Sequence, residues 1–96
     1  MVDERDVESY LVRCVKAVGG RCVKFNPESM RGMPDRVVMF PQGRLWWVEL
    51  KKPKGGRLSP VQVHRHKELR DLGQNVAVVW CKEDVDELCE TAAAHT

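Results

Sequence analysis

The sequence predicts an α/β fold in which a central mixed sheet is flanked by helices, with the element order α-β-β-β-α-β-α. Apolar residues recur at the spacing of an amphipathic helix in two segments, a third segment begins with the capping residues of a helix, and four short runs are rich in β-branched or aromatic residues. Glycine, proline or asparagine separates most of these segments, which is typical of turns. A length of 96 residues suits one domain, and we treat residues 1–96 as a single unit.

The first helix is expected over residues 3–18, where Val7, Leu11 and Val18 recur at helical spacing. Acidic residues in its first turn suit the positive end of the helix dipole. Two glycines at positions 19 and 20 would then end the helix.

Four strands are expected from the short β-rich runs. The second and third are separated only by Pro41-Gln42-Gly43, so they should form a hairpin. The fourth is an unbroken apolar run, which indicates a strand buried on both faces. The expected strands are residues 22–25, 37–40, 45–51 and 76–80.

The second helix is expected over residues 59–72. Ser59 suits its N-cap, proline follows at the first helical position, and Gln62 completes a capping box. A glycine-containing turn follows, and residues 83–93 are expected to form the third helix, with apolar residues on one side.

The composition is that of an ordinary globular protein, with 43% hydrophobic and 31% charged residues. No apolar run approaches the roughly 18 residues that span a bilayer, and the acidic first residues do not resemble a signal peptide. We therefore expect a cytoplasmic protein of a bacterial or phage-infected cell. The four cysteines are interpreted as small buried residues, although their spacing alone also permits a disulfide or a metal site; they are Cys14, Cys22, Cys81 and Cys89.

Charge is distributed unevenly along the chain, although the net charge is only +2. Residues 44–70 contain eight Lys or Arg and two Glu, whereas residues 82–96 contain one Lys and five acidic residues. Phosphate contacts act over about 8–10 Å, so a local basic segment matters more than the total charge. The middle of the chain is therefore the expected face for a polyanion.

Two short motifs carry the candidate chemistry: Pro34-Asp35, and Glu49 followed by Lys51. Side chains alternate along a strand, so Glu49 and Lys51 should point to the same side, close to Asp35 if the two strands are neighbours. Carboxylate oxygens suit Mg²⁺ or Mn²⁺, and the backbone carbonyl of Leu50 could add a third ligand. A metal held in this way can activate water against a phosphodiester, with the lysine orienting that water.

The same residues also admit a simpler interpretation. Glu49 and Lys51 could be a surface ion pair on a sheet edge, with Asp35 capping a turn. Their occurrence together, one hairpin apart and followed by a basic loop, favours the metal-dependent site.

The order of elements and the two motifs resemble the PD-(D/E)xK nuclease core. More narrowly, the chain resembles the VRR-NUC family over almost its whole length, as a minimal stand-alone phage-type member. The resemblance is carried by Gly32-Met33-Pro34-Asp35, by Val48-Glu49-Leu50-Lys51, by the loop and helix start at residues 52–62, and by a Glu in the first helix.

This resemblance implies roles for five side chains. Asp35 and Glu49 would be metal ligands and Lys51 the catalytic lysine. Gln62 would be a polar residue of the active site, a role compatible with its capping box. Glu8 would be an acid near a second metal position, unless it is an ordinary solvated helix residue.

Contacts with the DNA backbone are expected from the basic loop after the third strand and from the second helix. Glycines let the loop approach phosphates closely. His64 and His66 are interpreted as surface residues of that helix. The DNA-binding candidates are Lys52, Lys54, Arg57, Arg65 and Lys67.

These observations predict a Mg²⁺- or Mn²⁺-dependent DNA endonuclease without a small-molecule cofactor or a membrane partner. Minimal members resembling this chain are homodimers that resolve four-way (Holliday) junctions, which is the leading expectation. The alternatives are a flap or general structure-specific nicking nuclease and a non-catalytic DNA-binding module on the same fold. A third is a protein-interaction domain that docks through its acidic C-terminal helix.

Overall fold

The computed structural model describes residues 2–94 and contains three helices and four strands in the predicted order. Every boundary lies within one residue of its predicted position, because hydrophobic periodicity, the capping residues of the second helix and the turn residues mark these limits. The elements are α1 (Glu4–Ala17), β1 (Arg21–Lys24), β2 (Arg36–Phe40), β3 (Arg44–Leu50), α2 (Pro60–Asp71), β4 (Asn75–Val79) and α3 (Lys82–Ala94).

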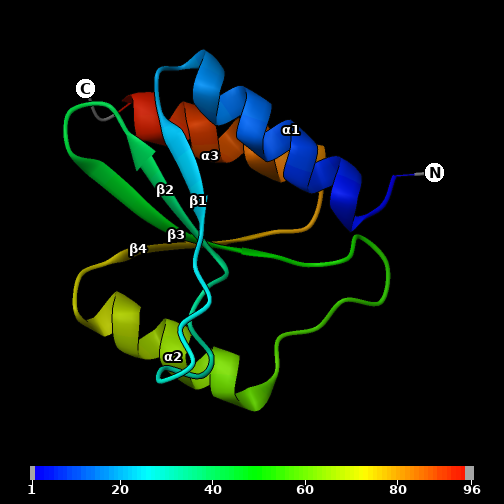
Figure 1. The fold of residues 1–96 in the computed structure, drawn as a ribbon, viewed down its shortest axis with the longest axis vertical. Coiled ribbons are helices and arrows are strands. Elements are labelled where there is room, and N and C mark those ends of the chain that lie inside the picture. The colour runs from blue at the N-terminus through cyan, green and yellow to red at the C-terminus, as the bar shows by residue number, and fades with distance from the viewer. Residues whose placement is uncertain (1, 95–96) are drawn as a thin grey trace.

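The strands form one mixed sheet in the order β1-β2-β3-β4. The first three are antiparallel neighbours, and β4 pairs parallel to β3 after the crossover through α2. Helices α1 and α3 lie together on one face of the sheet, and α2 covers the other face (Figure 1). The sheet therefore separates an apolar layer from the layer in which α2 meets β3.

The main core lies between the sheet and the pair α1 and α3. Val7, Leu11 and Val15 of α1 are fully buried there, with Val48 of β3. Val18, which the helical spacing includes in the first helix, is the C-cap of α1 and is 44% exposed.

The prediction that β4 is buried on both faces is wrong. Strand β4 lies at the edge of the sheet; Val79 is 1% exposed, whereas Val76, Ala77 and Val78 are only half-buried and Asn75 is exposed. An apolar run does not distinguish a central strand from an edge strand that two helices partly cover.

Within the described part of the chain, all four cysteines are free and half-buried. Cys14, Cys22 and Cys89 pack against the core, as expected for small apolar residues. None of the described helices is long and apolar enough to cross a bilayer.

Candidate active site

The hairpin register brings Asp35 and Glu49 together. Arg36 pairs with Val48, so one step further along the two strands Asp35 lies opposite Glu49. Phe25 N donates to Asp35 O at 2.9 Å, and Leu50 N donates to Asp35 Oδ1 at 3.2 Å. Backbone groups of two strands thus fix the position of this aspartate.

A glycine before Asp35 allows the preceding loop to lie against α2. Gly32 has a φ of 83°, and a Cβ atom there would meet the carbonyl oxygen of Val61 at 2.5 Å. A larger residue would therefore clash with the backbone of α2 and would strain its own backbone. This close approach joins the loop that carries Asp35 to the helix that carries Gln62.

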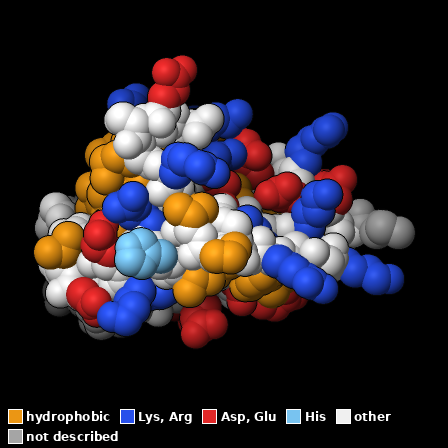
Figure 2. Space-filling model, turned by 90° about the horizontal axis from the view of Figure 1, so that it is seen from below, with side chains coloured by type: hydrophobic (Ala, Val, Ile, Leu, Met, Phe, Trp, Pro, Cys, Tyr) orange, Lys and Arg blue, Asp and Glu red, His pale blue; other side chains and the backbone are white. Residues whose placement is uncertain are grey.

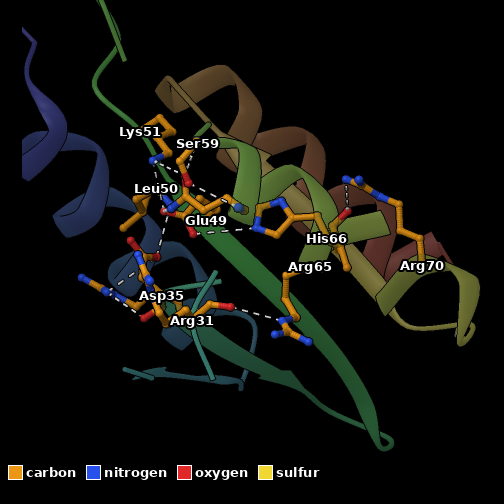
Figure 3. A network of polar contacts seen from close by, with 12 residues as sticks. Arg31, Asp35, Glu49, Leu50, Lys51, Ser59, Arg65, His66 and Arg70 are labelled. Carbon is orange, nitrogen blue, oxygen red and sulfur yellow. Dashed lines mark hydrogen bonds and ion pairs between the residues drawn. The ribbon is translucent and has the colours of Figure 1, made fainter. Parts of the chain in front are cut away.

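Glu49 is buried under α2, with a side chain that is 5% exposed. Its Oε2 lies 3.6 Å from Lys51 Nζ and accepts a hydrogen bond from Gln62 Nε2 at 3.3 Å. Figure 3 shows Glu49 and Lys51 on the side of β3 that faces α2, as strand alternation predicts. Lys51 follows the end of β3, and its N–H still donates to Val79 O at 3.1 Å.

Gln62 serves the helix cap and the site at once. Its Oε1 accepts from Ser59 N at 2.9 Å and from Lys51 Nζ at 3.0 Å, and Gln62 N donates to Ser59 Oγ at 3.3 Å. The capping box predicted from the sequence is therefore present. The same amide orients the lysine and the buried glutamate.

Glu8 of α1 is held by an arginine that the sequence interpretation missed. Arg36 is 9% exposed; its Nη2 lies 3.0 Å from Glu8 Oε2, and its Nη1 donates to Asp35 O at 2.9 Å and lies 3.7 Å from Asp35 Oδ1. Alternation along β2 could have indicated this position, because Arg36 shares a face with the buried Val38 and Phe40. Glu8 is thus tied to Asp35 through a cation.

His66 is the second residue that sequence reasoning misplaced. The interpretation of His66 as a surface residue is wrong: it is 1% exposed and its Nε2 lies 3.9 Å from Glu49 Oε1. Helical spacing from Gln62 to His66 and Leu69 was the available signal, because these positions share the inner face of α2. His64 is exposed, as expected. Burial, followed by the charges of Arg70 and Lys51, lowers the pKa of His66.

The two carboxylates have the electrostatics of a cation site. Burial, and after it the charge of Asp35, raises the pKa of Glu49 to about 7, while Lys51 opposes this rise. Burial also raises the pKa of Asp35, against the hydrogen bond from Leu50 N. Two carboxylates whose charged forms are disfavoured by burial, one of them also by its neighbour, fit Mg²⁺ or Mn²⁺ as hard oxygen ligands.

The protein supplies only part of a coordination shell. Among residues 2–94, no three His, Cys, Asp or Glu side chains lie close enough together to hold a metal ion. Magnesium commonly takes one or two carboxylates and completes its shell with water and phosphate oxygens, so a buried Glu49 beside a partly exposed Asp35 still fits it.

Basic residues of the loop after β3 lie near Glu8. Lys52 and Lys54 line a cavity of about 470 Å³ together with Glu8 and residues 2–5 at the start of α1. Arg57 is exposed on the same loop. Figure 2, which views the molecule from the α2 side, shows Lys and Arg side chains gathered toward the end that carries this loop.

The two basic candidates on α2 lie elsewhere. Arg65 donates to Arg31 O at 3.2 Å and pairs with Glu68 at 2.7 Å, and Lys67 pairs with Asp71 at 2.7 Å. Neither residue lines the cavity beside Glu8. The structure thus groups Lys52 and Lys54 with Glu8 and leaves Arg65 and Lys67 in local ion pairs.

An antiparallel hairpin followed by a parallel strand, with Asp35 opposite Glu49 and Lys51 beside it, places the chain in the PD-(D/E)xK class of nuclease folds. Comparison with known proteins narrows this class. The chain is 38% identical over 79 residues to "Putative nuclease p44" of Acyrthosiphon pisum secondary endosymbiont phage 1, covering 82% of this chain and 84% of that protein.

A solved structure described as "VRR_NUC domain" has a TM-score of 0.84 and 37% identity to this chain, with 91% of this chain and 94% of that chain covered. No family model matches the sequence. The two similarities extend over most of the chain and agree with the motifs. The chain belongs to the VRR-NUC nuclease family.

Proposed function

We propose that this chain is a Mg²⁺- or Mn²⁺-dependent endonuclease that hydrolyses phosphodiester bonds in DNA. The observation that carries the proposal is the position of Asp35 opposite Glu49, with Lys51 Nζ 3.6 Å from Glu49, in a member of a nuclease family. The "Putative nuclease p44" similarity supports the same activity.

Asp35, Glu49 and the carbonyl of Leu50 are the proposed metal ligands. A divalent cation bound there would supply a water of lowered pKa and neutralise charge that develops on the phosphate. Lys51 orients the attacking water and stabilises the negative transition state. Gln62 holds Lys51 and Glu49 in that arrangement through its two hydrogen bonds.

Glu8 and the loop beside it form the proposed approach for DNA. Glu8 would serve a second metal position, where it exchanges its ion pair with Arg36 for a cation. Lys52, Lys54 and Arg57 are exposed on the adjoining loop and are the proposed phosphate contacts. Arg65 and Lys67 would contribute less, because each already pairs with an acid.

The proposed substrate is a four-way junction, cut by a homodimer of residues 1–96 in the cytoplasm of a bacterial or phage-infected cell. A core of this size offers little surface to recognise a single flap end, whereas two-fold symmetry would place two sites across a junction. Nicking of flaps or other branched DNA by a monomer is the second possibility within the same chemistry.

The test compares cleavage of four-way junctions, flaps and linear duplex with Mg²⁺, Mn²⁺ or EDTA. Asp35→Asn and Lys51→Ala should abolish metal-dependent cutting. Lys16→Ala, which removes an exposed charge from α1, should cut like the unchanged protein. Full cleavage by Asp35→Asn, or binding to every substrate without metal-dependent cutting, would contradict the nuclease proposal.

The oligomeric state separates the two substrates. A mass measurement in solution beside the cleavage assay should give twice the chain mass of 11.0 kDa and symmetric paired cuts in the junction. If the protein is a monomer that cuts one strand of a flap, the nicking proposal would replace the junction-resolution proposal.

A further inference from the structure

His66 occupies an unusual position for a polar side chain. It is 1% exposed, and neither of its ring nitrogens has a hydrogen-bond partner within residues 2–94. Two buried polar atoms without hydrogen bonds destabilise a fold. An apolar side chain of similar volume would fill this space without that cost. Packing alone therefore does not explain why a histidine lies here.

A carboxylate oxygen of Glu49 close to His66 also lacks a hydrogen-bond partner. Glu49 Oε1 is buried without a hydrogen bond and lies 3.9 Å from His66 Nε2, whereas Glu49 Oε2 faces Gln62 and Lys51. Gln62 and His66 are one helical turn apart, so both reach Glu49 from α2, as Figure 3 shows for His66. A small approach of the ring would bring Nε2 within hydrogen-bond distance of Oε1.

We propose that His66 is a positioning residue for the metal ligand Glu49: its Nε2–H donates to Glu49 Oε1 and fixes the plane of the carboxylate. Helix α2 then holds both oxygens, Oε2 through Gln62 and Oε1 through His66. A carboxylate held at both ends presents its remaining lone pairs in one direction and loses little freedom when a cation binds. This inference rests on the proposed function, because it assigns Glu49 to the metal.

The test uses the full chain and Mn²⁺ alone as the probe, with binding followed by the electron paramagnetic resonance signal of free Mn²⁺. His66→Leu removes the donor and keeps an apolar side chain of similar size. His66→Gln keeps an N–H near the position of Nε2. Leu69→Val is the matched control, because Leu69 is buried on the same helix and contacts neither carboxylate by a polar group.

His66→Leu should weaken Mn²⁺ binding about tenfold, while its metal-free unfolding temperature stays the same or rises. His66→Gln should bind within about threefold of the unchanged protein, and Leu69→Val should bind equally well. A purely structural histidine predicts the reverse: lower stability in His66→Leu with unchanged affinity per folded molecule.

Normal Mn²⁺ binding by His66→Leu would overturn the inference, as would failure of His66→Gln to recover affinity while it remains folded. These outcomes leave the nuclease proposal intact if the unchanged protein binds Mn²⁺ and cuts DNA. An unchanged protein that neither binds Mn²⁺ nor cuts DNA in its presence would instead overturn the proposed function, and this inference with it.

Discussion

Asp35 and Glu49 lie opposite each other on adjacent strands, yet the protein holds them in different ways. Asp35 is 35% exposed at its side chain and is fixed by backbone groups, including Leu50 N at 3.2 Å. Glu49 is 5% exposed and is contacted by side chains of α2 and by Lys51. One carboxylate therefore depends on the hairpin, and the other depends on how α2 docks against the sheet.

Because of this difference, mutations near Glu49 and mutations near Asp35 should have different effects. Changes at Gln62 or His66, on the inner face of α2, should alter Glu49 more than Asp35, because the Asp35 carboxylate accepts its hydrogen bond from Leu50 N and not from α2. The energetic roles differ as well, because burial of a charged carboxylate destabilises the fold far more than partial exposure does. Glu49 is thus the more costly of the two to keep ionised.

The largest expected effect is loss of cleavage in both carboxylate variants. Asp35→Asn and Glu49→Gln each remove one proposed metal ligand, and each should lower the rate of metal-dependent DNA cleavage by at least about 100-fold. Single-turnover cleavage of a labelled branched substrate measures this loss. A residual rate near that of the unchanged protein in either variant would show that the two carboxylates do not share one metal.

The second prediction concerns stability and pH in the metal-free protein. The pKa of Glu49 is raised from 4.5 to about 7 in the folded state, so the folded protein binds the proton of this carboxyl group more tightly than the unfolded chain does. Its contribution to stability is present below about pH 4.5 and is lost as the pH rises through about 7. The loss is about 3 kcal/mol.

Urea unfolding between pH 4 and 8 tests this prediction. Glu49→Gln should be more stable than the unchanged protein at pH 8 and should show a flatter pH profile. Asp35→Asn should change the profile less, because its carboxylate is more exposed. Parallel profiles for the unchanged protein and Glu49→Gln would contradict the role assigned to burial.

The third prediction separates the cap of α2 from its role in the site. Gln62→Ala removes the amide that contacts Lys51 and Glu49, so cleavage should fall about tenfold. Ser59→Ala removes only the N-cap hydroxyl and should cost about 1 kcal/mol of stability with little change in the cleavage rate at 25 °C. Equal losses of cleavage in the two variants would indicate that the helix start alone governs the site.

The smallest effect is expected for DNA affinity. Lys54 lies on the loop beside Glu8, so Lys54→Ala should reduce the slope of log affinity against log salt by about 1. Lys67 is paired with Asp71 on the outside of α2, and Lys67→Ala should leave that slope unchanged. Fluorescence anisotropy with a catalytically inactive variant over a salt series measures both. A larger effect of Lys67→Ala would move the DNA contact onto α2.

The parts of the fold that sequence predicted correctly depend on local rules. Helical spacing of Val7 and Leu11, turn residues and the capping box at Ser59 set the element boundaries, and the short turn at residues 41–43 set the hairpin that brings Asp35 opposite Glu49. The edge position of β4 is a property of the whole sheet, so its apolar run misled the prediction.

Arg36 and His66 were missed for a related reason. Each is a basic residue on an inward face, and a basic residue is interpreted as exposed unless its partner is known. The partners, Glu8 for Arg36 and Glu49 for His66, come from other elements and meet them only in the folded chain. Charge alone therefore predicted that the basic residues of α2 lie on its surface, whereas Gln62 and His66 contact Glu49 from its inner face.

The shared hydrogen bonds of Gln62 link the order of α2 to the state of the site. Fraying of the first helical turn would release Lys51 and one oxygen of Glu49 together, because the same amide holds Ser59 N, Lys51 Nζ and Glu49 Oε2. A cation that engages Glu49 should in turn slow amide hydrogen exchange at residues 61–63 more than at the far end of the helix. Local unfolding of the first turn of α2 would then switch the site between a form in which Gln62 holds Lys51 and Glu49 and a form in which both are released.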